Sequence, residues 1–283
     1  MLKTIISMFK SKDIRNRILF TLAMLFIFRF GAAITVPGVD ISTMTNAKSN
    51  SLFEMINLLG GGGLEQLSVF ALGVGPYITA SIIIQLLSMD VIPALTELAK
   101  GGATGKKQID KYTRYLAVVL GFFQASTLIY GFSRAYPGLL VEGDGWASIL
   151  YISTVLTGGS MFLLWIGDRI SMKGIGNGIS MIIAAGIIAR LPHQMITAWE
   201  TVVDTSSSSA TFNGILGFAG YILCYLLIIV FVVFMQTAER KIPIQYTSST
   251  VTTRKKDMTY LPLKINSASV IPVIFASSLM VAP

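Results

Sequence analysis

Residues 66–89 read QLSVFALGVGPYITASIIIQLLSM, a run of 24 residues without a charged side chain. A helix needs about 20 largely apolar residues to cross the hydrocarbon core of a bilayer. This stretch therefore predicts a membrane-spanning helix, and the same pattern recurs along the rest of the chain.

The overall composition also indicates a membrane protein. The 283 residues are 53% hydrophobic and only 13% charged, whereas soluble domains usually carry about a quarter charged residues. The block 18–39 is interrupted only by Arg29. Further uncharged runs cover residues 115–133, 145–167, 174–189, 205–237 and 265–283, and the short run 174–189 continues past Arg190 to Ala198. The sequence predicts an all-α polytopic helical bundle of about seven spans.

Basic residues are concentrated in alternate connections between these spans. Most of the 22 Lys and Arg residues precede the first span or lie between spans two and three, four and five, or six and seven. The other connections hold only Lys48, Arg134 and Arg190. Because basic loops stay in the cytoplasm, the pattern predicts a cytoplasmic N-terminus.

Two of the predicted spans share a short motif. Residues 74–81 read VGPYITAS and residues 270–277 read VIPVIFAS, so both follow V-x-P-x-I-x-A-S. The predicted topology makes the two segments run in opposite directions, which indicates an inverted repeat with a path near the membrane midplane. By itself this pattern fits a secondary transporter as well as a channel.

Motifs for catalysis or cofactor binding are not found in the sequence. Residues 100–107, KGGATGKK, resemble a phosphate-binding loop, but the glycine spacing is one residue short and Lys107 replaces the required Ser or Thr. Residues 174–178, GIGNG, have no preceding strand as a dinucleotide site needs. His193 is the single histidine and Cys224 the single cysteine. We therefore expect no enzyme activity, no cofactor and no metal.

Several stretches resemble signatures of the SecY family. Residues 68–85, SVFALGVGPYITASIIIQ, resemble its second-helix signature, and residues 165–180, WIGDRISMKGIGNGIS, resemble the signature that enters helix five. Residues 261–266, LPLKIN, and 270–278, VIPVIFASS, are similar to the start of helix seven. The resemblance covers nearly the whole chain.

The resemblance implies a fold of ten helices in two inverted halves of five. Residues 1–198 would form the N-terminal half, with a plug region at 52–66 that contains four consecutive glycines. Residues 199–283 would begin a C-terminal half that is truncated here. The implied location is the bacterial inner membrane.

The resemblance also implies a function. The chain would be the central channel-forming subunit of the Sec protein translocase, which passes unfolded polypeptides across the membrane and releases apolar segments sideways into lipid. The implied partners are the small subunits SecE and SecG, the SecA motor ATPase, the ribosome, signal sequences and nascent polypeptides, and the lipid bilayer.

Site residues follow from the same resemblance, position by position. A ring of apolar side chains that closes the pore would comprise Val74, Ile78, Ile179, Ile183 and Ile274. A polar cluster at the lateral gate would comprise Thr79, Gln124 and Asn266. Without the resemblance, we would interpret the first set as helix-packing positions and the second as interhelical hydrogen-bonding residues. Cytosolic partner contacts are expected at Lys106, Lys107, Arg240, Lys241, Arg254, Lys255 and Lys256.

Overall fold

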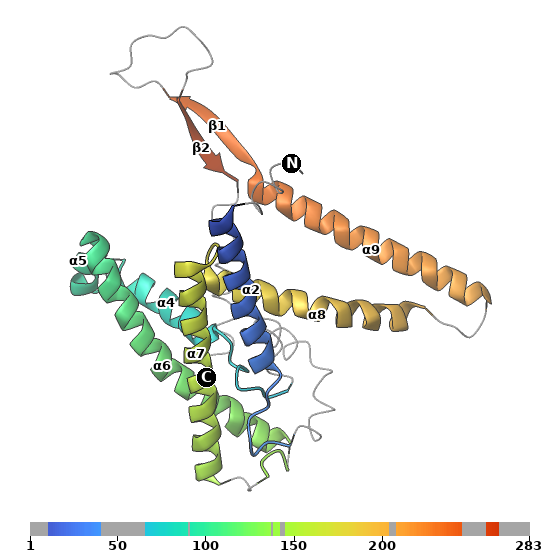
Figure 1. Ribbon diagram of the computed structural model, residues 1–283, viewed down its shortest axis with the longest axis horizontal. Coiled ribbons are helices and arrows are strands. Elements are labelled where there is room, and N and C mark those ends of the chain that lie inside the picture. Colours follow the sequence, from blue (N-terminus) through green and yellow to red (C-terminus); the bar gives the residue numbers. More distant parts are fainter. Residues whose placement is uncertain are drawn as a thin grey trace. The chain divides into compact units, whose positions relative to one another are not determined.

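The computed structural model describes residues 11–40, 66–89, 91–136, 138–141, 145–203, 208–244 and 259–265, and it confirms the helical fold class (Figure 1). The described helices are α2 (Lys12–Ala32), α4 (Gly75–Leu87), α5 (Pro93–Lys100), α6 (Gly102–Ala135), α7 (Trp146–Lys173), α8 (Gly178–Val202) and α9 (Ser208–Thr237). Two strands, β1 (Glu239–Ile244) and β2 (Thr259–Lys264), follow them.

The described chain falls into two compact units that meet within α8, between Pro192 and His193. The first unit contains α2, α4, α5, α6, α7 and the beginning of α8. The second contains the rest of α8, α9 and the two strands. The division expected after residue 198 remains a prediction.

Four helices among the described residues are long and apolar enough to cross a membrane. They are α6, α7, α8 and the part of α9 from Gly214 to Thr237, and they correspond to predicted spans three to six. The first predicted span lies in α2, which begins at Lys12 and ends at Ala32, before the expected end at residue 39. The seventh predicted span, 265–283, lies almost entirely outside the described residues.

The second predicted span is the clearest correction. Residues 66–74 form consecutive turns, and the helix begins only at Gly75 and ends at Leu87. Its 13 residues rise about 20 Å, less than the roughly 30 Å of a bilayer core. Gly73 adopts a left-handed φ of 57° that ends the turn segment, and Pro76 then occupies the first turn of α4, where proline is well tolerated.

The turn segment before α4 is buried by protein. Leu67, Ser68 and Phe70 are all less than 5% exposed. Its backbone also pairs with the residues after α2, since Val36 donates to the Leu67 carbonyl and Val69 donates to the Ile34 carbonyl, each at 3.0 Å. Irregular backbone at membrane depth is tolerated when protein satisfies its polar groups in this way.

Helix α7 is at the centre of the first unit. In Figure 1 it lies beside α2 and α6, and its buried side chains enter two apolar clusters. One cluster contains Ile129 of α6 with Ile152 and Leu156 of α7. The other contains Phe28 of α2 with Leu163, Ile166 and Ile170 of α7 and Ile182 of α8. These clusters fix the positions of α2, α6 and α8 around α7.

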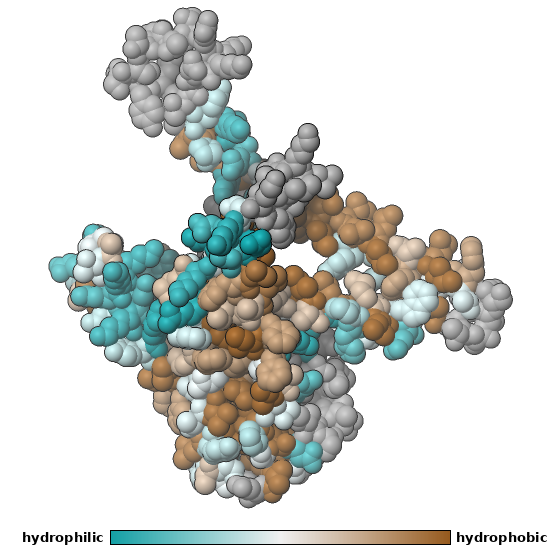
Figure 2. All heavy atoms as spheres, in the orientation of Figure 1, coloured by the Kyte–Doolittle hydropathy of each residue, from teal (hydrophilic) through white to brown (hydrophobic). Residues whose placement is uncertain are grey.

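Two segments expected as cytosolic loops have regular structure. Helix α6 has 34 residues and is about 51 Å long, which is more than the roughly 30 Å of a bilayer core, and its basic beginning is residues 102–114. Figure 2 shows hydrophilic residues over α5 and the beginnings of α6 and α2. In the second unit, β1 and β2 pair antiparallel, with Glu239 opposite Lys264. This hairpin was not predicted.

Helix α9 of the second unit has an almost wholly exposed apolar surface. Its spanning part has the highest mean hydropathy of the four candidate spans and none of its most apolar 18 residues is buried, and its surface is largely hydrophobic in Figure 2. A helix apolar on every side is typical of a membrane span.

Candidate functional site

The described members of the expected apolar ring lie in one cluster. Val74 is buried beside Phe28, Phe70 and Leu163, and Ile78, Ile179 and Ile183 pack against the same cluster while remaining partly exposed. Val74 precedes the helix as the N-cap of α4, and its carbonyl accepts the N–H of Ile78 at 3.1 Å. Ile274 lies outside the described residues.

Burial separates the four described side chains into two kinds. Val74 is only 3% exposed, so it packs as a core residue of the cluster. The three isoleucines keep part of their surface free, from α4 on one side and the first turns of α8 on the other. This arrangement places partly exposed, uncharged side chains of α4 and α8 around one apolar cluster.

The beginning of α8 is fixed by local hydrogen bonds. Gly176 adopts a left-handed φ of 71° in the turn between α7 and α8. Asn177 then caps α8, because its Oδ1 accepts the N–H groups of Ile179 at 3.0 Å and Ser180 at 3.4 Å. This is the usual role of an N-cap side chain. It explains why GIGNG occurs here without a dinucleotide site.

Side chains from the neighbouring helices complete this turn. Thr21 of α2, itself buried, accepts the N–H of Ile175 through Oγ1 at 3.1 Å. Ser171 of α7 accepts the N–H of Gly178 through Oγ at 2.8 Å and donates to the carbonyl of Gly167 at 3.0 Å. Together these bonds join α2, α7 and α8 directly before Ile179.

Close backbone packing accompanies these bonds. A Cβ added to Gly178 would overlap the carbonyl oxygen of Gly167, and a Cβ on Gly167 would press on the side chains of Ile179 and Ile182. Glycine at 178 is therefore required for this close approach of α7 and α8, whereas a larger residue at 167 would require the Ile179 side chain to shift by a few tenths of an ångström. The isoleucine pair at the start of α8 therefore rests directly on α7.

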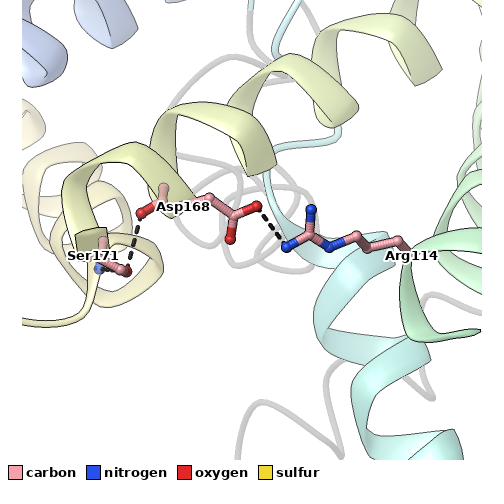
Figure 3. A network of polar contacts seen from close by, with 5 residues as sticks. Arg114, Asp168 and Ser171 are labelled. Carbon is pink, nitrogen blue, oxygen red and sulfur yellow. Dashed lines mark hydrogen bonds and ion pairs between the residues drawn. The ribbon is translucent and has the colours of Figure 1, made fainter. Parts of the chain in front are cut away.

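An ion pair next to this turn was not predicted from the sequence. Arg114 Nη2 of α6 lies 2.8 Å from Asp168 Oδ2 of α7, and Figure 3 draws this pair beside the Ser171 bonds. In the sequence, Arg114 directly precedes the uncharged run 115–133, and Asp168 lies within the stretch 165–180 that resembles the family signature.

The expected polar cluster is only partly within the described residues. The Thr79 hydroxyl donates to the carbonyl of Gly75 in its own helix at 3.2 Å. Gln124 Oε1 on α6 is buried and has no hydrogen-bond partner among the described residues. Asn266 lies outside them. Helices α4 and α6 do pack together, but Thr79 and Gln124 are not brought into a common hydrogen bond in the described part of the chain.

The expected partner contacts lie on exposed surfaces where they are described. Lys106 and Lys107 lie on the first turns of α6, and Arg240 and Lys241 on β1. Arg254, Lys255 and Lys256 lie outside the described residues, as does the plug region 52–66 except for Gln66. Within the described ranges, no three His, Cys, Asp or Glu side chains are grouped as a metal site would require.

Comparisons with known proteins agree with this architecture. The family model for SecY matches residues 68–283. The protein translocase subunit SecY of Bacillus subtilis (strain 168) is 45% identical to the chain over 285 aligned positions, which cover 100% of this chain and 66% of the relative. The chain thus spans slightly less than two-thirds of that relative's length.

Solved structures share the fold. A protein-conducting channel matches with a TM-score of 0.61 and 19% identity, over 94% of this chain and 56% of the channel chain. Sec61 in the canine ribosome–channel complex from the endoplasmic reticulum matches with a TM-score of 0.59 and 20% identity, over 94% of this chain and 57% of that chain. Because the family model covers most of the residues and the bacterial relative is similar throughout, this chain belongs to the SecY family.

Proposed function

We propose that this chain forms part of a protein-conducting channel that passes unfolded polypeptides across a bacterial inner membrane and releases apolar segments sideways into lipid. The observation that carries the proposal is that Ile78 of α4 and Ile179 and Ile183 of α8 all pack, partly exposed, against one buried apolar cluster. The name of the B. subtilis relative, a protein translocase subunit, favours a channel over a secondary transporter.

An apolar constriction suits the transport of a chain of varied chemistry. Short apolar passages exclude water and ions by dewetting. Branched aliphatic side chains can nevertheless change rotamer around a passing polypeptide, because they form no directional bonds with it. With Ile274 as a further member, Val74, Ile78, Ile179 and Ile183 would close the resting channel.

Sideways release requires that helices separate rather than that a bond be broken. Helices α4 and α6 pack against each other, and Gln124 presents a buried carbonyl oxygen without a partner in the described residues. We infer that Thr79, Gln124 and Asn266 form a polar contact at this opening. A central Leu or Ile then favours membrane insertion by roughly 0.5 kcal/mol and a central Lys or Asp opposes it by about 3 kcal/mol.

The energy for transport would come from partners. We propose that the N-terminus and the basic ends of α2, α6 and the β1–β2 hairpin face the cytoplasm, where SecA or a ribosome would dock. SecE and SecG would complete the membrane part. Sec61, which shares this fold, is found in a complex with the ribosome, and the exposed Arg240 and Lys241 supply positive charge for an acidic motor surface or ribosomal RNA.

The docking proposal predicts a salt-dependent contact at β1. Changing Arg240 and Lys241 together to Glu should weaken binding of SecA or ribosomes to the intact protein about tenfold or more at low salt. Each cationic side chain that contacts an anionic partner releases a counterion and so favours binding, and the variant lacks both of these contributions. Binding is measured with proteoliposomes over a range of salt concentrations. The same reversal at Arg134 and Arg190, predicted to lie on the opposite side, is the matched control. Equal affinity of the two double variants would contradict docking at β1.

Transport itself is tested with the intact protein purified from membranes and reconstituted with its small subunits and SecA. We expect a secretory precursor to become protected from added protease only when ATP is supplied. If the proteoliposomes instead take up a small solute at a rate that saturates with its concentration, and the precursor stays accessible to protease, the secondary transporter would be supported.

A further inference from the structure

We propose that Ser171 is a positioning residue that sets where Ile179 and Ile183 stand in the constriction. The proposal rests on the function proposed above, but its argument comes from the junction of α7 and α8. Ser171 lies in the last turn of α7 and touches neither isoleucine through a hydrogen bond of its own. Its effect would pass through the backbone of Gly178.

The Ser171 hydroxyl joins the end of one helix to the start of the next. It donates to the carbonyl of Gly167 and accepts the N–H of Gly178 (Figure 3). The first four N–H groups of any helix lack partners within that helix. Asn177 satisfies two of them, those of Ile179 and Ser180, and Ser171 satisfies that of Gly178. The rotation of α8 about its axis at its first residue is thereby fixed.

Translation of α8 toward α7 is limited by the two glycines. Gly178 lies against the Gly167 carbonyl so closely that a Cβ would overlap it. Successive residues of an α-helix are about 100° apart around the axis. A rotation of α8 at Gly178 would therefore turn Ile179 and Ile183, which lie on one face four residues apart, about the helix axis and change how both pack against the cluster that Ile78 also contacts.

The α7 end of this junction is itself held by its neighbours. Arg114 pairs with Asp168, the residue directly after Gly167, and Thr21 of α2 binds the backbone of Ile175. Since α7 and the turn are fixed in this way, removal of the Ser171 hydroxyl would release α8 rather than move α7. A contact that only stabilised the fold would not act selectively on the constriction.

The test compares Ser171→Ala, Ser171→Cys and Ser171→Thr in the intact protein, with ion conductance of the resting channel measured in planar bilayers. Threonine keeps the hydroxyl, cysteine offers a weaker acceptor, and alanine offers none. We expect conductance to rise about fivefold for Ser171→Ala, the factor that one net hydrogen bond contributes, less for Ser171→Cys and not at all for Ser171→Thr. If the alanine variant does not fold, the conductance of Ser171→Cys is compared with that of Ser171→Thr, and the proposal requires the cysteine variant to conduct more.

Thr154→Ala is the matched control. Thr154 lies on the same helix, and its hydroxyl donates to the backbone carbonyl of Leu150 within that helix. A conductance increase with Thr154→Ala equal to that with Ser171→Ala would overturn the proposal. So would an unchanged conductance in both Ser171→Ala and Ser171→Cys.

A second comparison separates this proposal from the proposed function. In a channel already opened by Ile78→Ser with Ile183→Ser, Ser171→Ala should add no further conductance, because it acts through the same constriction. If the isoleucine pair leaks and Ser171→Ala does not, the positioning role is wrong and the constriction stands. If the isoleucine pair stays tight, the constriction itself is wrong, and the positioning role falls with it.

Discussion

Replacing Ile78 and Ile183 together by serine is expected to make the resting channel conduct ions without a precursor. Both side chains pack at the margin of the cluster that contains Val74. Serine removes apolar bulk from the constriction and supplies hydroxyl groups that hold water, and both changes lower the dewetting barrier. A barrier lower by about 1.4 kcal/mol raises the passage rate about tenfold, so we expect at least that increase in planar bilayers that contain the intact protein.

The control for this variant uses exposed positions on the same two helices. Leu86 of α4 is 47% exposed and Ile188 of α8 is 62% exposed. Leu86→Ser with Ile188→Ser should alter stability modestly and leave the conductance unchanged. A folded Ile78→Ser, Ile183→Ser channel as tight as the control would mean that these isoleucines are helix-packing residues only.

A single methyl group at Gly159 is expected to destabilise the protein strongly. A Cβ at this position of α7 would overlap the carbonyl oxygen of Val69, in the buried turn segment before α4. Backbone cannot rotate away as a side chain does, so Gly159→Ala must displace either α7 or the segment that leads to Val74. Overpacking of this kind costs about 1–3 kcal/mol, which should lower the Tm of the detergent-purified protein by several degrees.

The adjacent glycine supplies the control. Gly158 has no atom within 4 Å of an added Cβ and lines an apolar groove of about 450 Å³ that also includes Ile27 and Phe162. Gly158→Ala should therefore be neutral or stabilise the helix by up to about 1 kcal/mol. Equal Tm values for the two alanine variants would contradict the close packing of α7 on the turn segment.

The long spans could be predicted from the sequence because an apolar run of sufficient length is enough, without distant contacts, to indicate a membrane-spanning helix. Uncharged runs such as 145–167 and 205–237 correspond to α7 and α9, since a helix that satisfies its own backbone is the structure that lipid permits. The limits of those helices were less predictable. Charge alone does not say that residues 102–114 continue the helix of α6 or that Glu239–Ile244 pairs with Thr259–Lys264.

The short α4 shows where a local pattern fails. Residues 66–89 are apolar enough for a complete span, yet residues 66–74 form turns because α7 and the segment after α2 bury them and bond their backbone. The signals in the sequence were Gly73, Gly75 and Pro76. The resemblance groups Val74 and Ile78 with Ile179 and Ile183, and all four belong to or pack against one cluster in the structure, while their role as a pore ring stays a prediction.

The polar contacts around the α7–α8 turn depend on tertiary structure. Arg114 and Asp168 are distant in sequence, and only the packing of α6 on α7 brings their charges together. Thr21 and Ile175 are separated still further. A cue was present in the stretch 165–180, where Asp168 and Ser171 stand at the end of an apolar run, a position at which polar side chains commonly bind backbone.

A translocating polypeptide is expected to pass between Ile78 and the beginning of α8. The most direct measurement places a photo-reactive amino acid at Ile183, or at Ile188 as the comparison, in the intact protein that holds an arrested secretory precursor. We predict that the residue at 183 crosslinks to the precursor and that the residue at 188 crosslinks to lipid. Precursor crosslinks from 188 and none from 183 would contradict the account, because the path would then lie outside the proposed constriction.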